Sequence, residues 1–218
     1  MVHKHAPLAL FHCDAVQAAS AFDLVALVEA SDLLSLSAHK FGGPKGTGIL
    51  VIKDKSKVRP LALGGSQEKD LRPGTHDLAS IAAMTVALEE AQRRYPTAHA
   101  SLTTLRDNFE TAVAKEVPEA IVTGVDVARS PAITHLLLPE STSEELLFLL
   151  DQSDVAASGG AACASGALDP SHVLLAMGIE PRRAKGALRF SFSPSNSVEE
   201  VQCAAKALGV TYRRLVRR

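Results

Sequence analysis

The segment from residue 7 to residue 40 constrains the fold more than any other part of this chain. It contains an apolar run that ends in aspartate (PLALFHCD), a stretch with helical character (DLVALVEA) and a second apolar run that ends in histidine and lysine (DLLSLSAHK). A strand, a helix and a strand in this order favour two parallel strands joined by a right-handed crossover. The sequence therefore predicts an α/β fold.

The rest of the chain predicts a second region with its own strands and helices. Residues 78–95 have apolar positions spaced three and four apart, as in a long helix, and Pro96 is expected to end it. We place a domain boundary there, between residues 1–95 and residues 96–218. The second domain is expected to be α+β, with strands at 120–125, 132–139 and 186–195, a helix at 101–117, and further helices opened by capping boxes at Thr142–Glu145 and Ser197–Glu200.

Charge and hydropathy exclude several classes of protein. Lys and Arg number 23 and Asp and Glu 24, so no bulk charge points to nucleic acid or to a membrane surface. No apolar run approaches the ~18 residues of a membrane span, and the first residues lack a signal-peptide cleavage site. The three cysteines have no C-x-x-C spacing, and beyond an H-x-H at the beginning the histidines have no metal-site spacing. We therefore expect a cytoplasmic protein, in a reducing compartment, that binds no metal.

Two chemically useful side chains follow the first two predicted strands. Asp14 ends the first strand and Lys40 follows the second, and in open α/β sheets ligands bind at this edge. A lysine there can form a Schiff base with a carbonyl, and a carboxylate can pair with a pyridinium nitrogen. These two groups are the minimum that pyridoxal phosphate requires of a protein. The spacing alone also suits a surface lysine and a turn-forming aspartate.

The sequence motifs around these residues indicate a protein family more specifically than the spacing of Asp14 and Lys40 does. The chain contains, in order, D-A-V-Q at 14–17, S-L-S-A-H-K-F-G-G-P-K-G at 35–46, L-R-P-G-T at 71–75, S-G-G-A-A-C-A-S-G-A-L-D-P-S-H-V-L at 158–174 and L-R-F-S at 188–191. This succession resembles the class V aminotransferase family and, within it, the cysteine desulfurases that supply sulfur for iron–sulfur clusters. The resemblance runs from about residue 8 to about residue 205.

The resemblance implies a set of cofactor-binding residues. Lys40 matches the lysine that forms the Schiff base with pyridoxal 5'-phosphate, and Asp14 matches the partner of the pyridine nitrogen. Gln17 matches the residue that contacts the phenolic oxygen of the ring. Ser37 and His39 match residues that help to bind the phosphate. We expect His39 to take part in catalysis beside Lys40.

Three more residues are carried over from the family. Thr75 matches the threonine that reaches the cofactor phosphate of a neighbouring subunit, and Arg189 matches the arginine that binds the substrate carboxylate, a bidentate task suited to guanidinium. Cys163 matches the nucleophile that takes the substrate sulfur as a persulfide, and the small residues around it suit a mobile loop. Cys13 and Cys203 are expected to be core residues.

Family members are considerably longer on the N-terminal side. Their upstream part carries a glycine/threonine loop for the phosphate, a histidine that stacks on the ring and an asparagine that contacts the substrate, and this sequence has no counterpart of these. Three interpretations follow. The chain is one half of a split or truncated desulfurase, it is an inactive remnant or scaffold of the family, or it is a related aminotransferase or selenocysteine lyase.

We expect the first interpretation. The chain then holds the C-terminal part of the large domain of a PLP-dependent transferase, followed by an α+β small domain with the cysteine loop. The complete enzyme converts L-cysteine to L-alanine, for iron–sulfur cluster assembly or other sulfur transfer. The expected partners are a second subunit or a complementing N-terminal chain, and a sulfur-acceptor or scaffold protein.

Overall fold

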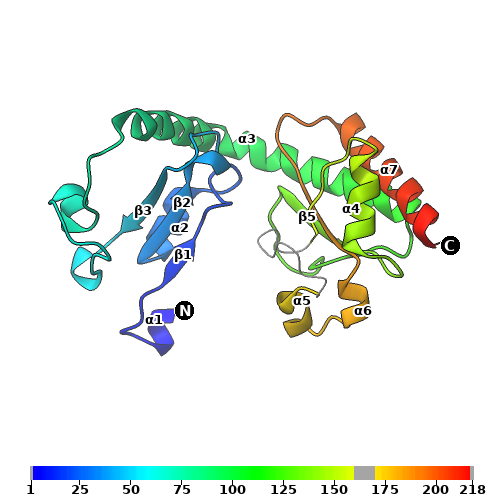
Figure 1. Ribbon diagram of the computed structural model, residues 1–218, viewed down its shortest axis with the longest axis horizontal. Helices are drawn as coiled ribbons and strands as arrows, with labels where there is room; N and C mark the ends of the chain where they lie inside the picture. Colours follow the sequence, from blue (N-terminus) through cyan, green and yellow to red (C-terminus); the bar gives the residue numbers. More distant parts are fainter. Residues whose placement is uncertain (1, 160–169, 217–218) are drawn as a thin grey trace. The chain divides into compact units, whose positions relative to one another are not determined.

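The computed structural model describes residues 2–159 and 170–216, which form two compact units, Met1–His99 and Ala100–Arg218 (Figure 1). Helix α3 (Leu78–Glu116) contributes to both units, because the boundary between them falls inside it. No helix in the described ranges is both long and apolar enough to cross a membrane.

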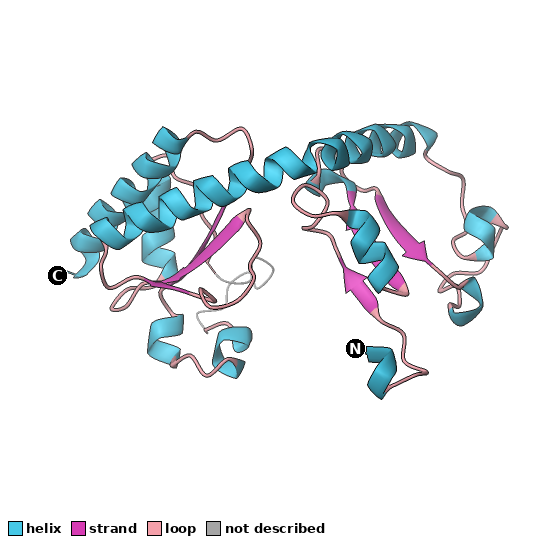
Figure 2. Cartoon of the chain, turned by 180° about the vertical axis from the view of Figure 1, so that it is seen from behind, coloured by secondary structure: helices cyan, strands magenta, loops and turns pink. Residues whose placement is uncertain are grey.

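The first unit is built on a three-stranded sheet in the order β1-β2-β3 (Figure 2). Strand β1 (His12–Asp14) pairs in parallel with β2 (Leu33–Ser37), and α2 (Leu24–Ala30) lies between them in the chain. Strand β3 (Gly48–Ile52) pairs antiparallel with β2. The predicted parallel strand pair is confirmed, but the first strand covers only the end of the predicted segment. Short helices complete the unit: α1 (Val2–His5) and the 3-10 turns η1 (Ala38–Lys40), η2 (Lys55–Lys57) and η3 (Gln67–Asp70).

The alternation of side chains along β2 separates a core face from a polar face. Leu34 and Leu36 are buried, whereas Ser35 and Ser37 point to the opposite side of the strand. On the core face the leucines pack with residues from the β1–α2 connection, from α2 and from α3, namely Ala15, Ala19, Leu24 and Met84. Cys13 is only half-buried against this cluster.

One glutamine of α3 fixes the connection between β1 and α2. The Gln92 Oε1 accepts a hydrogen bond from the Leu24 backbone N–H at 3.0 Å. Its Nε2 donates to the Ala19 carbonyl at 2.7 Å and to the Phe22 carbonyl at 3.0 Å. Gln92 therefore satisfies three backbone groups of the connection, which cannot pair with one another in a regular element.

Helix α3 continues through Pro96, so the prediction that the helix ends there is wrong. A proline inside a helix removes one backbone hydrogen bond and crowds the carbonyl four residues earlier, which costs about 3 kcal/mol. Contacts on both sides offset this cost: Gln92 binds the β1–α2 connection, and the His99 Nδ1 lies 2.8 Å from the Ala21 carbonyl. The division into a large-domain part and a small domain stays a prediction.

The second unit has an antiparallel sheet in the order β4-β5-β6 (Figure 2). Its strands are β4 (Ile121–Val122), β5 (Ile133–Leu137) and β6 (Ala187–Ser191). Its helices are α4 (Ser143–Asp151), α5 (His172–Ala176), α6 (Pro181–Ala184) and α7 (Val198–Val216). The three predicted strands and the mixed α/β character are confirmed.

Both predicted N-cap residues of this unit cap their helices, and the reciprocal capping box is complete at α7. At α4, the Glu145 N–H donates to the Thr142 Oγ1 at 3.3 Å, and that hydroxyl donates to the Glu145 carboxylate at 2.8 Å. At α7, the Glu200 N–H donates to the Ser197 Oγ at 3.1 Å, and the Ser197 N–H donates to the Glu200 carboxylate at 2.9 Å. Local sequence therefore sets where these two helices begin.

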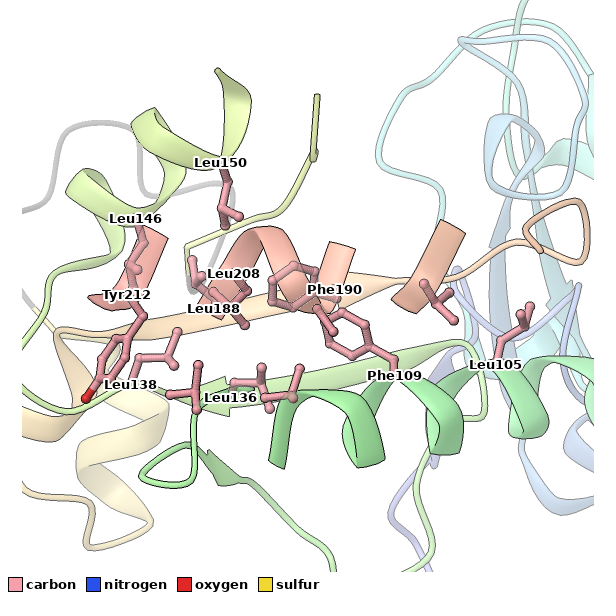
Figure 3. Packing of buried hydrophobic residues seen from close by; sticks show 14 residues of the cluster. Leu105, Phe109, Leu136, Leu138, Leu146, Leu150, Leu188, Phe190, Leu208 and Tyr212 are labelled. Atoms are coloured by element: carbon pink, nitrogen blue, oxygen red, sulfur yellow. The ribbon is translucent and has the colours of Figure 1, made fainter. Parts of the chain in front are cut away.

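The core of the second unit lies between the sheet and helices α3, α4 and α7 (Figure 3). The rings of Phe109 on α3 and Phe190 on β6 have centroids 4.7 Å apart. Around them pack leucines from the sheet and the helices, among them Leu136, Leu188, Leu146 and Leu208. Cys203 lies on the exposed side of α7, so the prediction that it is a core residue is wrong.

The first prediction concerns Gln92. Gln92→Ala leaves one N–H and two carbonyls of the β1–α2 connection without partners, so we expect it to lower the free energy of unfolding by about 2–3 kcal/mol. Gln202→Ala, on the exposed side of α7, is the matched control and should change it by less than about 0.5 kcal/mol. Urea unfolding followed by circular dichroism measures both. Equal effects of the two substitutions would contradict this role of Gln92.

Candidate active site

The parallel pairing of β1 and β2 sets the position of Asp14. Asp14 is the last residue of β1 and lies opposite Ser35 of β2. Its carboxylate is exposed, and its Oδ1 accepts from the Val16 N–H at 3.2 Å. Gln17 is exposed in the turn that follows. The aspartate therefore lies at the carboxyl end of its strand, as the sequence predicts.

Lys40 lies at the end of the turn η1, directly after β2. The turn is fixed by Ala38, which is fully buried and whose carbonyl accepts from Phe41 N–H at 3.1 Å and from Gly43 N–H at 2.9 Å. A Cβ on Gly43 would lie 2.9 Å from the Cβ of Ala38, so only glycine allows this close approach. The buried Ala38 thus anchors the turn, and the exposed Lys40 lies at the sheet edge where β1 also ends.

Ser37 and His39, both predicted to bind a phosphate, contact one another. The Ser37 Oγ lies 2.9 Å from the His39 Nδ1. Serine and histidine both supply hydrogen-bond donors that an anionic oxygen can use. The structure thus brings together the residues expected around Lys40, and their role in phosphate binding stays a prediction.

Two residues on the same sheet face, His12 and Ser35, were not predicted as site residues. His12 and Asp14 alternate with the half-buried Cys13 on β1, and the His12 Nε2 lies 2.8 Å from the Ser35 Oγ on β2. The face that carries Asp14 therefore has polar residues on both strands, beside the half-buried Leu33. The alternation of polar and apolar residues in HCD and LLSLS is the signal that could have revealed this face.

The predicted contact of Thr75 with another subunit is not tested by this single chain. Thr75 is exposed and follows Gly74, whose φ of 110° is accessible to glycine and whose N–H donates to the Gln67 Oε1 at 3.1 Å. This places Thr75 in the loop between η3 and α3. Its exposure leaves its hydroxyl accessible from outside the unit.

Arg189 belongs to the second unit, at the centre of β6. It lies opposite His135 of β5, and on its other side it exchanges two backbone hydrogen bonds with Ser158, at 3.0 and 2.7 Å. The side chain is half-buried, and its Nε is buried with no hydrogen-bond partner within the described ranges. Ser158 also begins the predicted cysteine loop, of which Cys163 lies outside the described residues.

His135 is a neighbour of Arg189 that the sequence did not predict as a site residue. Burial, and then the Arg189 guanidinium, lower the pKa of His135 below its ordinary value. Its Nδ1 lies 2.9 Å from the Thr123 Oγ1. The imidazole is therefore neutral at neutral pH. Only the cross-strand register brings these residues together, since they are far apart in the sequence.

Comparisons with known proteins identify the family of this chain. The sequence profile of the family described as Aminotransferase class-V matches residues 1–203. A cysteine desulfurase of Enterobacter agglomerans is 39% identical over 199 residues, which cover 91% of this chain and 49% of that protein. The chain spans about half the length of the curated relatives it matches.

Two solved structures extend this likeness to the fold. A NifS-like protein superposes with a TM-score of 0.82 at 32% identity, over 96% of this chain and 54% of that one. The structure described as SspA in complex with cysteine gives 0.67 at 29% identity, over 90% of this chain and 53% of that one. The chain therefore belongs to the class V aminotransferase family.

Proposed function

We propose that this chain provides the cofactor lysine, the sulfur-accepting cysteine and the substrate arginine of a PLP-dependent cysteine desulfurase. The observation that carries the proposal is the placement of Asp14 and Lys40 after two adjacent parallel strands, at one edge of the sheet. The named relatives are cysteine desulfurases, and the similar SspA structure contains cysteine. The substrate proposed for the complete enzyme is L-cysteine.

The residues at this edge fit pyridoxal 5'-phosphate. Lys40 offers an exposed amine for the aldehyde of the cofactor, and Asp14 offers an exposed carboxylate for its ring nitrogen. The Ser37–His39 pair offers hydrogen-bond donors for its phosphate. Gln17 is available to the phenolic oxygen. When bound, the cofactor supplies an electron sink for the bonds next to the substrate amine.

Each side chain then has a defined task. With the cofactor bound, Asp14 would hold a proton at the pyridine nitrogen, and the Lys40 Nζ would carry protons to and from the substrate carbons. Arg189 binds the substrate carboxylate through two parallel hydrogen bonds and so fixes the orientation of the amino acid. Its Nε has no hydrogen-bond partner within the described ranges, which favours an outside ligand.

The Cys163 thiolate is the proposed sulfur acceptor. Its Sγ attacks the sulfur of L-cysteine, a new S–S bond forms, the substrate C–S bond breaks, and the carbon is protonated. Overall, L-cysteine and the Cys163 thiol are converted to L-alanine and a persulfide on Cys163. A reducing compartment such as the cytoplasm suits this chemistry, and the cysteines within the described ranges, Cys13 and Cys203, are free thiols.

The partners follow from the same residues. The exposed Thr75 suits contact with the cofactor phosphate of a second subunit. Because the relatives are about twice as long as the matched region, we propose that a complete site also needs the equivalent of their remaining half. The persulfide is proposed to pass to a sulfur-acceptor or scaffold protein, for iron–sulfur clusters or other sulfur transfer.

Cofactor binding tests the role of Lys40. After incubation with pyridoxal phosphate and desalting, we expect the protein to be yellow, and Lys40→Ala to abolish the visible absorbance because the attachment amine is lost. Lys45→Ala, an exposed lysine of the same loop, is the matched control and should keep the colour. A Lys40→Ala protein as yellow as the wild type would overturn the assignment. A colourless wild-type protein would count against cofactor binding by this chain alone and favour a scaffold.

Sulfide release tests the role of Cys163. With L-cysteine and a thiol reductant, we expect Cys163→Ala to reduce sulfide release to background, because the proposed sulfur-accepting thiol of the chain is lost, while any transamination continues. Cys203→Ala, on the exposed side of α7, should release sulfide at the wild-type rate. Unchanged release by Cys163→Ala would instead favour a related aminotransferase or selenocysteine lyase.

A further inference from the structure

Four residues form a continuous row across the sheet of the second unit. Thr123 follows β4 and donates its backbone N–H to the His135 carbonyl at 2.9 Å, His135 lies opposite Arg189, and Arg189 bridges to Ser158. Residues in register on neighbouring strands have side chains on the same face. The neighbours of Arg189 along β6, Leu188 and Phe190, point to the opposite face, into the hydrophobic core (Figure 3).

The hydrogen-bond pattern makes the contact between His135 and Arg189 a close one. In an antiparallel pair, the N–H and C=O of one residue point to the same neighbouring strand. Those of Arg189 bond to Ser158, and the carbonyl of His135 bonds to Thr123. His135 and Arg189 are therefore a non-hydrogen-bonded pair, the type in which the Cα atoms are only about 4.5 Å apart and the side chains are nearest.

Arg189 differs from most arginines of its unit in its lack of a counter-ion. The Arg129 guanidinium binds Glu110 at 2.7 Å, and Arg213 binds Glu116 at 3.2 Å. Carboxylates also pair with Arg106, Arg182 and Arg183. Within the described ranges no carboxylate pairs with Arg189, although its Nε is buried. The position opposite it, where a carboxylate could neutralise it, is occupied by histidine.

We propose that His135, held by Thr123, is a positioning residue that keeps the Arg189 guanidinium in place, with no counter-ion from the described part of the chain, so that it can bind the substrate carboxylate. The inference rests on the proposed function of Arg189. An aspartate or glutamate at this position would capture the guanidinium, and a lysine or arginine would repel it. A neutral imidazole does neither, and its hydrogen bond to the Thr123 Oγ1 restricts where its ring can lie.

The arrangement couples the binding of a carboxylate to Arg189 with the protonation of His135. Within the described ranges the charged group that acts on His135 is Arg189 from β6, while Thr123, on the β4 side, is uncharged. A carboxylate bound to Arg189 offsets the positive charge that lowers the pKa of His135, so that pKa should rise on binding. By linkage, the carboxylate binds more tightly as the pH falls through the pKa of His135.

The coupling can be measured by NMR titration of the His135 imidazole in the full chain, without cofactor. We expect Arg189→Gln to raise the pKa of His135, and Arg183→Gln, an exposed arginine of α6, to leave it unchanged. Propionate, a carboxylate with neither amine nor thiol, should raise the same pKa in the wild type and not in Arg189→Gln. If Arg189→Gln and Arg183→Gln gave the same pKa, the inference would be overturned.

The propionate arm separates this inference from the proposed function. Propionate that shifts the Arg189 side-chain resonances but leaves the pKa of His135 unchanged contradicts the role of His135 alone. Propionate that shifts neither contradicts the carboxylate-binding role of Arg189, and with it the function on which the inference rests.

Substitution of His135 tests the positioning role directly. His135→Asp places a carboxylate opposite Arg189, and we expect the dissociation constant of propionate to rise about tenfold, which corresponds to one new ion pair of moderate strength. His135→Asn keeps a neutral hydrogen-bonding side chain and should stay within about threefold of the wild type. Backbone NMR spectra establish that both variants are folded. Equal propionate affinity of His135→Asp and the wild type would refute the positioning role.

Discussion

The parallel pairing of β1 with β2 is the interaction on which the proposed cofactor site depends. Its register places Asp14 opposite Ser35, so that both strands end at the same edge and Lys40 follows in the next turn. A one-residue shift of β1 would turn Asp14 to the core face, and a one-residue shift of β2 would bury its serines and expose Leu34 and Leu36. The buried Leu34 and Leu36 therefore fix the chemistry on the other side of the sheet as well as the packing on their own.

The connection between these strands is held from outside the sheet. Gln92 and His99 of α3 bind backbone carbonyls of residues 19–22, a segment that otherwise lacks regular hydrogen bonds. The same contacts anchor α3 on both sides of Pro96, where a helix in isolation would be weakest. One set of polar contacts thus supports both the segment after Asp14 and the continuity of the longest helix in the described ranges.

In the second unit, the pairing of arginines with carboxylates distinguishes Arg189 from the arginines that serve structure. Carboxylates neutralise the arginines that serve structure, as in the pair of Glu110 and Arg129. In this pair, burial acts to raise the pKa of Glu110, but the hydrogen bonds from Arg129 and Thr134 outweigh it and the pKa is lowered. Arg189 has a neutral histidine opposite it instead. A cation that has no carboxylate partner in the described part of the chain, at a partly buried position, is suited to an external anion, which is the reason for proposing the substrate carboxylate there.

The sequence by itself determined the elements and the family. Alternation in HCD and LLSLS, the capping boxes at Thr142 and Ser197, and the motifs around Lys40 and Arg189 are local signals, so they could be interpreted without a structure. Only the tertiary structure decided that α3 passes through Pro96, that Cys203 is exposed, and that Thr123, His135, Arg189 and Ser158 form one row. These outcomes depend on contacts between segments distant in the chain. Local residue patterns indicate which face of a strand is buried, but they do not say which strand it pairs with or which distant residues anchor a helix.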